Sequence, residues 1–220
     1  MLLAVLAAGS EAEATQLLAP ILSVGNPDVS MTNESWAETY AAFQIPITEE
    51  PANSKFLSQF ISEPFPAEAI DLVASFVAKA PTPGCGYFTN AFGGMVTGSK
   101  PYGGSAFAHR TALFYAEPGS GWGTRGGGMS AEADPLTAEF LTWVAEFGEA
   151  LEPCVKGAYV NVPNAGMANW ETAYWGANVE RLRTIKAKYD PDNVFRYEQS
   201  IPPATQPPES VRDFLERRAR

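Results

Sequence analysis

The sequence predicts an α+β fold: a mostly antiparallel sheet with helices packed on one face, followed by a C-terminal helical segment. Two observations predict it. Some segments repeat apolar residues at helical spacing, and others alternate with the period of a strand. Glycine and proline separate them, and the expected order is strand-helix, strand-helix, two strands, helix, strand. A layered α+β structure fits that order best.

The composition supports a folded chain and excludes some partners. The chain has 220 residues, 45% of them apolar, which is enough for one domain with a substantial core. Its net charge is −10, although nine of the 15 Lys and Arg residues follow residue 176. Because phosphate binding needs clustered cations, a nucleic-acid surface is not expected.

No apolar run approaches the roughly 20 residues that span a membrane, so no membrane partner is expected. Residues 1–8 are apolar but short, and they lack the basic start of a signal peptide. We therefore expect a strand there and a cytoplasmic location by default. Secretion stays open if the true N-terminus lies upstream.

The first elements are a strand over residues 2–6 and a helix that begins at a capping box of Ser10 and Glu13. Pro20 marks the end of this helix or a tightening near it. A second helix is expected over residues 33–43.

The sequence of the middle of the chain predicts three strands and one helix. Residues 55–61 alternate loosely as a strand, and residues 66–79 form a helix with a broad apolar face. Two strands over 86–96 and 105–117 follow, and the glycine-rich residues 119–128 are expected to be a mobile loop.

The clearest helix covers residues 135–151. Its apolar face is formed by Leu136, Phe140, Val144, Phe147 and Leu151. A strand over 156–162 follows, and then an amphipathic helix over 179–189. Asp190 and Pro191 stop that helix, and a short apolar strand is expected after them.

His109 is the only histidine, and it lies in a predicted strand. It suits a general base or a hydrogen-bond donor, but a hydrogen-bonded structural histidine is the alternative. Cys85 and Cys154 form neither a metal-ligand spacing nor a disulfide framework, so we expect two buried thiols and no metal site.

Tyr159 and Asn161 fall on one face of the predicted strand over 156–162. A phenol beside an amide can meet a planar heterocycle by stacking and hydrogen bonding. The alternative is an edge strand whose polar residues face water. Trp170, Tyr174 and Trp175 form an aromatic cluster that begins the terminal segment.

Several motifs occur together in one order. They are Tyr159-x-Asn161, the aromatic cluster at 170–175, Asp190-Pro191-x-Asn193-x-Phe195 and Gln199-Ser200-Ile201. This order resembles the C-terminal part of the berberine bridge enzyme-like family of FAD-linked oxidases. Residues 90–94 and 107–110 are similar to that family's substrate domain.

The resemblance implies oxidation of a small organic substrate by hydride transfer to FAD, with oxygen as acceptor. It implies catalytic roles for His109 and Tyr159, and flavin contacts from Tyr159, Asn161 and Asn193. Val162 stands where some family members have a tyrosine base, so another residue must act as base or the substrate differs.

The resemblance also divides the chain into a substrate-binding domain (1–162), a C-terminal family segment (163–205) and a charged tail (206–220). The family's glycine-rich pyrophosphate loop and its His and Cys flavin attachments have no match in this sequence. We therefore expect no tight FAD binding by this chain alone, a flavin-domain partner chain, and an exposed interface in the C-terminal segment. The alternative function is a truncated, non-catalytic binding domain without flavin.

Overall fold

The structure is a computed structural model that describes residues 4, 9–42, 51–94, 96–97, 105–124, 131 and 133–204. The chain divides into two compact units, residues 1–50 and 51–220, and each is treated by itself. The strand expected over 2–6 lies outside the described residues except for Ala4, and so does the tail over 206–220.

The first unit contains helices α1 (Glu11–Leu22) and α2 (Trp36–Ala42). The predicted capping box is confirmed, because Ser10 Oγ accepts from Glu13 N and the Glu13 carboxylate accepts from Ser10 N. Pro20 lies inside α1, which continues for two more residues.

Helix α2 begins later than the predicted residue 33, because Ser35 and Glu38 form a second reciprocal pair at its start. Glu38 N lies 3.3 Å from Ser35 Oγ, and Ser35 N lies 2.9 Å from Glu38 Oε2. This pair satisfies two backbone N–H groups at the helix N-terminus.

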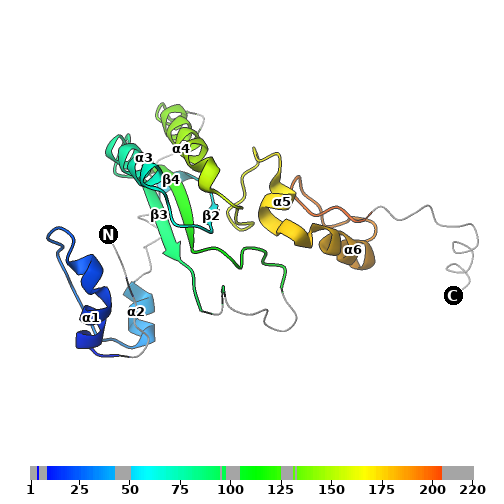
Figure 1. Ribbon diagram of the computed structural model, residues 1–220. Helices are drawn as coiled ribbons and strands as arrows, with labels where there is room; N and C mark the ends of the chain where they lie inside the picture. Colours follow the sequence, from blue (N-terminus) through cyan, green and yellow to red (C-terminus); the bar gives the residue numbers. More distant parts are fainter. Residues whose placement is uncertain are drawn as a thin grey trace, which may run out of the picture. The chain divides into compact units, whose positions relative to one another are not determined.

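The second unit is built on an antiparallel sheet around the long strand β4 (Phe114–Thr124). Strand β3 (Cys85–Ala91) pairs with one edge of β4. Strands β1 (Pro51–Phe56) and β2 (Gln59–Ile61) pair with the other edge in line with each other (Figure 1). The antiparallel sheet is as predicted.

Strands β1 and β2 are two parts of one ladder. Phe56 lies opposite Gly119 and Gln59 lies opposite Ala116, so the register is continuous across the gap. Within the gap, Leu57 N donates to Pro118 O at 3.0 Å, but proline has no N–H to donate back. The predicted strand over 55–61 is therefore present, and Pro118 interrupts its pairing.

Two strand predictions around β4 were wrong in their boundaries. Residues 105–113 form a loop, and β4 begins only at Phe114. The strand also continues to Thr124, through residues 119–124 that were expected to be a loop. Pairing with β1 along this stretch, together with β3 at Gly119 and Ser120, outweighs the low strand propensity of glycine there. Strand β3 likewise ends at Ala91 rather than residue 96.

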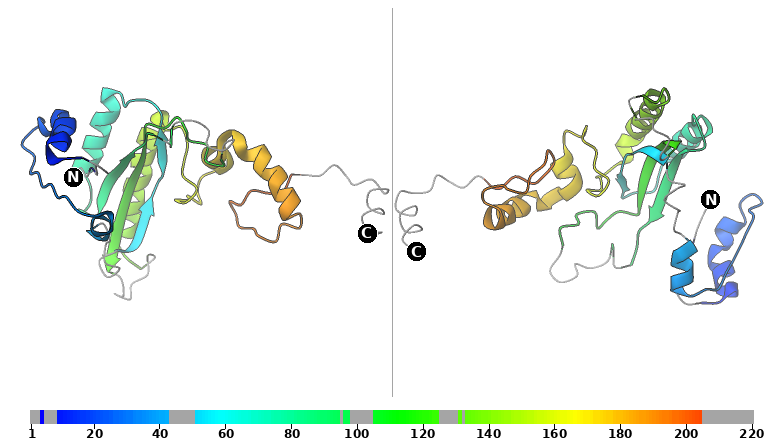
Figure 2. Two further views of the ribbon diagram at one scale, coloured as in Figure 1. Left: turned by 90° about the horizontal axis from the view of Figure 1, so that it is seen from below. Right: turned by 180° about the vertical axis from the view of Figure 1, so that it is seen from behind.

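Helices α3 (Ala67–Ala78) and α4 (Thr137–Leu151) pack on the same face of this sheet (Figure 2), which confirms the α+β prediction. Four of the five residues on the predicted apolar face of α4 are buried: Phe140, Val144, Phe147 and Leu151. They pack against Cys85 and Trp122 from the sheet, and this layer is the main core.

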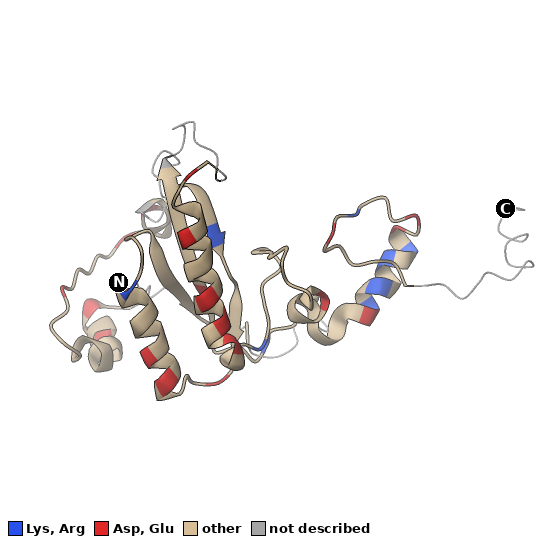
Figure 3. Ribbon diagram, turned by 90° about the horizontal axis from the view of Figure 1, so that it is seen from above, with Lys and Arg blue, Asp and Glu red and all other residues tan. Residues whose placement is uncertain are grey.

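The C-terminal segment contains α5 (Trp170–Trp175) and α6 (Val179–Tyr189), with a single 3-10 turn between them. Helix α6 ends at Asp190 as predicted. It contains Arg181, Arg183, Lys186 and Lys188, which colour much of its ribbon blue in Figure 3. Helices α3 and α4 instead bear acidic residues (Figure 3).

The strand expected over 156–162 is absent. Lys156 N donates to Phe60 O and Phe60 N donates to Gly157 O, both at 2.9 Å, so the segment pairs with β2 at one point. It then bends away, because Val162 N donates to Tyr159 O at 3.0 Å and closes a turn. The apolar strand expected after Asp190 is also absent, and a hydrogen-bonded turn replaces it.

Candidate functional site on the open face of the sheet

The face of the sheet that does not carry α3 and α4 has a different set of residues. Alternation along the strands brings Phe60 and Tyr115 side by side on this open face, with Asn90 on the other side of Tyr115. One row further along, the register places Ser58, Glu117 and Phe88 next to one another.

A second aromatic cluster lies on this face. Phe60 and Tyr115 are buried, and Phe92, Phe107 and Tyr159 pack against them. The ring centroid of Tyr159 lies 5.7 Å from that of Tyr115 and 6.1 Å from that of Phe60, both in edge-to-face geometry. Tyr159 therefore joins the sheet face although its own segment is not a strand.

Asn161 lies beside Tyr159, as the sequence predicted, but for a different reason. Asn161 Nδ2 donates to the Tyr159 phenol oxygen at 2.8 Å, and the turn over 159–162 rather than strand alternation brings the two together. Asn161 is exposed, whereas the Tyr159 ring is half-buried. The pair thus offers an accessible amide beside a fixed phenol.

Tyr115 and Glu117 form a second polar pair on the same face. The Tyr115 hydroxyl donates a hydrogen bond to Glu117 Oε1. Burial raises the pKa of Tyr115 well above its usual range, and the hydrogen bond and charge of Glu117 raise it further. Tyr115 therefore stays protonated and holds the half-buried carboxylate in place.

The sequence reasoning missed Tyr115 and Glu117. The available signal was their spacing of two residues in a segment predicted to be a strand, which places both on one face. The sequence gives no sign that loop 105–113 and the turn over 159–162 border this face, as they do in the structure.

His109 lies in the loop before β4 and not in a strand, so that prediction was wrong. Its ring stacks on Phe60 with centroids 4.0 Å apart, and its Nε2 lies 3.2 Å from Tyr174 O. Gly157 leaves room for the ring, because a Cβ there would come within 2.7 Å of His109 Nδ1. His109 thus links the sheet face, the residues before Tyr159, and α5.

Burial lowers the pKa of His109, although the carbonyl oxygens of Tyr174 and Ala158 favour the protonated ring. The imidazole is therefore neutral at pH 7. In its neutral form, Nε2–H donates to the Tyr174 carbonyl oxygen, which fixes the tautomer.

Asn193 lies in the turn after α6, apart from the other predicted site residues. It has a φ of 50°, and its N–H donates to Asp190 O. Within the described residues, no hydrogen bond links Asn193 to His109, Tyr159 or Asn161.

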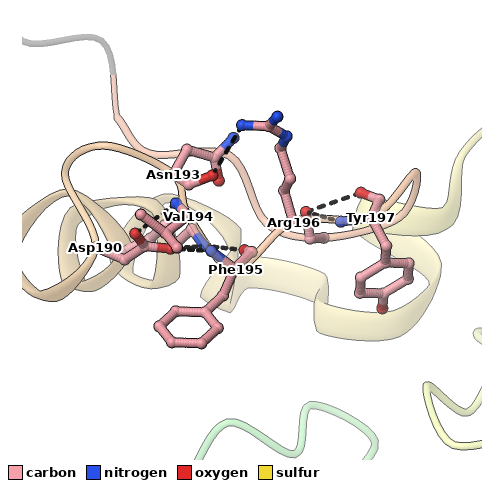
Figure 4. A network of polar contacts seen from close by, with 8 residues as sticks. Asp190, Asn193, Val194, Phe195, Arg196 and Tyr197 are labelled. Carbon is pink, nitrogen blue, oxygen red and sulfur yellow. Dashed lines mark hydrogen bonds and ion pairs between the residues drawn. The ribbon is translucent and has the colours of Figure 1, made fainter.

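The Asp190 carboxylate organises this turn (Figure 4). Its two oxygens accept from Val194 N at 2.7 Å and Phe195 N at 3.1 Å, and Lys186 forms an ion pair with it. The hydrogen bond from Lys186 lowers the pKa of Asp190, and the two backbone N–H groups add to this effect. The turn leaves the side chains of Val194 and Phe195 68% and 80% exposed.

The terminal segment is tied to the site through the Tyr174 hydroxyl. This oxygen accepts from Asn164 N at 2.9 Å and donates to Gln199 Oε1 at 3.3 Å. Gln199 Nε2 in turn donates to Asn164 O at 2.8 Å. Tyr174 and Gln199 are both buried, so a closed triangle of hydrogen bonds fixes the residues that follow Tyr159. Trp170 and Trp175, beside Tyr174, are only half-buried.

Comparison with known proteins shows what this chain is similar to. The family model described as "Berberine and berberine like" matches residues 158–202, which include Tyr159, Asn161, Tyr174 and Gln199. The FAD-linked oxidoreductase YgaK of Bacillus subtilis is 33% identical over 196 residues, covering 89% of this chain and 41% of that protein. The chain belongs to the berberine bridge enzyme-like family of FAD-linked oxidoreductases.

Two further similar proteins agree with this assignment. The monolignol oxidoreductase AtBBE-like 13 of Arabidopsis thaliana is 30% identical over 161 residues, covering 67% of this chain and 28% of that protein. The crystal structure of CrmK, a flavoenzyme of caerulomycin biosynthesis, matches with a TM-score of 0.71 at 25% identity, over 88% of this chain and 42% of CrmK. The chain thus spans about two-fifths of the length of YgaK and of CrmK.

Over the described ranges from residue 9 to residue 204, no three His, Cys, Asp or Glu side chains group as metal ligands. The helices described in those ranges include none that is long and apolar enough to cross a membrane.

Proposed function

We propose that this chain forms the substrate-side wall of an FAD-dependent oxidoreductase that oxidises a small organic molecule at a C–H bond. The observation that carries the proposal is the pairing of two polar dyads, Tyr115–Glu117 and Tyr159–Asn161, on one aromatic face of the sheet. One dyad contains a carboxylate that can accept a proton, and the other contains an accessible amide.

The residues on this face suit a flavin ring. An isoalloxazine is flat, with amide-like groups along one edge, so it needs an aromatic or apolar surface and a few hydrogen-bonding groups. Asn161 is exposed, and its Oδ1 is available to a ring N–H. We propose Asn161 and Tyr159 as the flavin-facing residues. Asn193 remains a candidate at the junction with the flavin-binding part.

When bound, FAD supplies the redox chemistry, taking a hydride from the substrate and passing the electrons to dioxygen. Glu117 is the proposed general base, since its carboxylate is held by the neutral Tyr115 phenol and shares the face with Tyr159. This assignment fills the role left open by Val162. The neutral His109 holds the wall together, and Tyr159 orients the substrate.

We further propose that the flavin-binding part of the enzyme packs against the C-terminal segment. Val194 and Phe195 are mostly exposed, and the half-buried Trp175 has an indole N–H without a hydrogen-bond partner among the described residues. Exposed apolar groups beside a basic helix favour contact with another surface. Because the diphosphate of FAD is usually held by backbone N–H groups of a glycine-rich loop, we expect no sub-micromolar FAD binding by this chain alone.

The test measures how fast a substrate reduces the bound flavin, without oxygen, in the FAD-loaded oxidoreductase that contains this chain. The substrates would be alcohols, including a monolignol, and amines. Glu117→Gln should slow flavin reduction by about 10²–10⁴-fold while bound FAD is retained. The matched control is Glu139→Gln, which changes an exposed carboxylate on α4. Equal rates in the two variants would contradict the role of Glu117. Calorimetry that shows sub-micromolar FAD binding to this chain alone would contradict the role of a separate flavin-binding part.

A further inference from the structure

We infer that Ser58 is a positioning residue, whose hydroxyl fixes the Tyr159 turn relative to the strand that carries Glu117. That Ser58 holds the turn follows from geometry alone. That this hold affects the rate of catalysis rests on the proposed function. Ser58 acts through Tyr159 and does not itself take part in the chemistry.

The hydroxyl of Ser58 is buried inside the Tyr159 turn. The Ser58 side chain is almost fully covered, with a relative exposure of 6%. Ser58 Oγ accepts from Tyr159 N at 2.9 Å and lies 3.2 Å from Val162 O, to which it donates. It therefore holds both ends of the turn that Val162 N and Tyr159 O close.

The backbone position of Ser58 explains why the side chain takes this role. Ser58 sits in the interruption between β1 and β2, next to Leu57, whose N–H bonds to Pro118 O. Its backbone groups therefore make no ladder bond to β4, and the register places it in a non-hydrogen-bonded pair with Glu117. Such pairs bring the two Cα atoms to about 4.5 Å, closer than hydrogen-bonded pairs.

Ser58 thus connects the backbones of the two dyads, beside the direct contact between the Tyr115 and Tyr159 rings. On one side it neighbours Glu117 across the ladder, and on the other it holds the backbone of Tyr159. The Tyr159 ring then lies edge-to-face against the Tyr115 ring, with the two ring centroids 5.7 Å apart. Because a misplacement of about 1 Å at an active site can slow catalysis about 100-fold, this connection matters for rate more than for affinity.

The experiment compares Ser58→Ala with two further variants. Ser58→Thr keeps the hydroxyl and should behave like the wild type. Ser54→Ala is the matched control, because it removes an exposed hydroxyl from the neighbouring strand β1 that makes no side-chain hydrogen bond among the described residues. Ser58→Cys replaces the hydroxyl with a thiol, which has a similar volume but is a weaker hydrogen-bond donor. This variant is used in place of Ser58→Ala if Ser58→Ala does not fold.

The first measurement is amide hydrogen exchange at residues 157–162, which needs no flavin. Loss of the bond to Ser58 Oγ should make the Tyr159 amide exchange about fivefold faster in Ser58→Ala, and Ser58→Thr should restore the wild-type rate. Unchanged exchange in Ser58→Ala would overturn the inference.

The second measurement is steady-state kinetics of the FAD-loaded oxidoreductase. Ser58→Ala should lower kcat by about tenfold with KM within twofold of the wild type, and Ser58→Thr should rescue kcat. Faster exchange with a kcat equal to that of Ser54→Ala would overturn the positioning role. An inactive wild type would overturn the proposed function and the catalytic part of this inference, while the exchange result would still decide whether Ser58 holds the turn.

Discussion

Asn161 Nδ2 lies 2.8 Å from the phenol oxygen of Tyr159, and a turn rather than a strand brings them together. The backbone of Tyr159 is fixed by Ser58 and its ring by Tyr115 and Phe60. Asn161 is held mainly through its bond to the phenol. The accessible half of the dyad therefore depends on the buried half.

Asn161→Ala should lower kcat of the flavin-loaded enzyme by about five- to tenfold, since it removes one hydrogen bond to the phenol and the amide that would face the flavin. The control is Val160→Ala, which changes the neighbouring residue of the same turn. Steady-state kinetics would compare the kcat of the two variants. Equal losses would mean that the dyad has only a structural role.

Gly157→Ala should destabilise the protein by about 1–3 kcal/mol, because the new methyl group would overlap the His109 ring and crowd Ala173 O. Gly166→Ala is the matched control, since a Cβ there would have no neighbour closer than 3.6 Å. Urea unfolding followed by tryptophan fluorescence would measure both. A Gly157→Ala variant as stable as Gly166→Ala would argue against the close packing of His109.

Tyr174→Phe should reduce the free energy of unfolding by about 1–3 kcal/mol, because it leaves Asn164 N–H and Gln199 Oε1 without their shared partner. Tyr189→Phe removes a hydroxyl from a tyrosine that is 74% exposed and should have little effect. Thermal unfolding of the two variants tests this. If both variants melted at the wild-type temperature, the claim that the hydrogen-bonded triangle stabilises the protein would be contradicted.

The pKa of His109 should be below 6.5, because burial disfavours the imidazolium. As pH falls below about 6.5, the unfolded chain binds a proton before the folded protein does. The free energy of unfolding should therefore decrease with falling pH until the folded pKa is passed, and His109→Asn should remove this dependence. NMR titration of the single imidazole is the direct measurement, and a midpoint at or above 6.5 would refute the prediction.

The elements with local signals were predictable. The spacing of Phe140, Val144, Phe147 and Leu151 predicts α4 and its buried face, and both features were confirmed. The capping box at Ser10 and the stop at Asp190 were confirmed for the same reason. Each depends on residues at most four apart, whose interactions form within one helical segment whatever the rest of the chain does.

The strands were predicted less well. The composition of residues 119–124 predicted a loop, yet they form half of β4 because β1 pairs along this stretch and β3 pairs with Gly119 and Ser120. Residues 156–162 alternate like a strand, yet Ser58 and the turn at Val162 bend them away after a single point of pairing with β2. Strand pairing depends on residues far apart in sequence, so propensity and alternation give only a weak prediction.

The sequence by itself determined the family, the buried face of α4, and the closeness of Tyr159 and Asn161. Tertiary structure alone decided that Glu117 shares a face with them, that Tyr115 holds its carboxylate, and that His109 is a neutral link between the sheet and α5. The physical reason is that the spacing of residues along one helix or strand decides which face of it each side chain points to. Its chemical role instead depends on burial and on partners that only the packing of distant segments supplies.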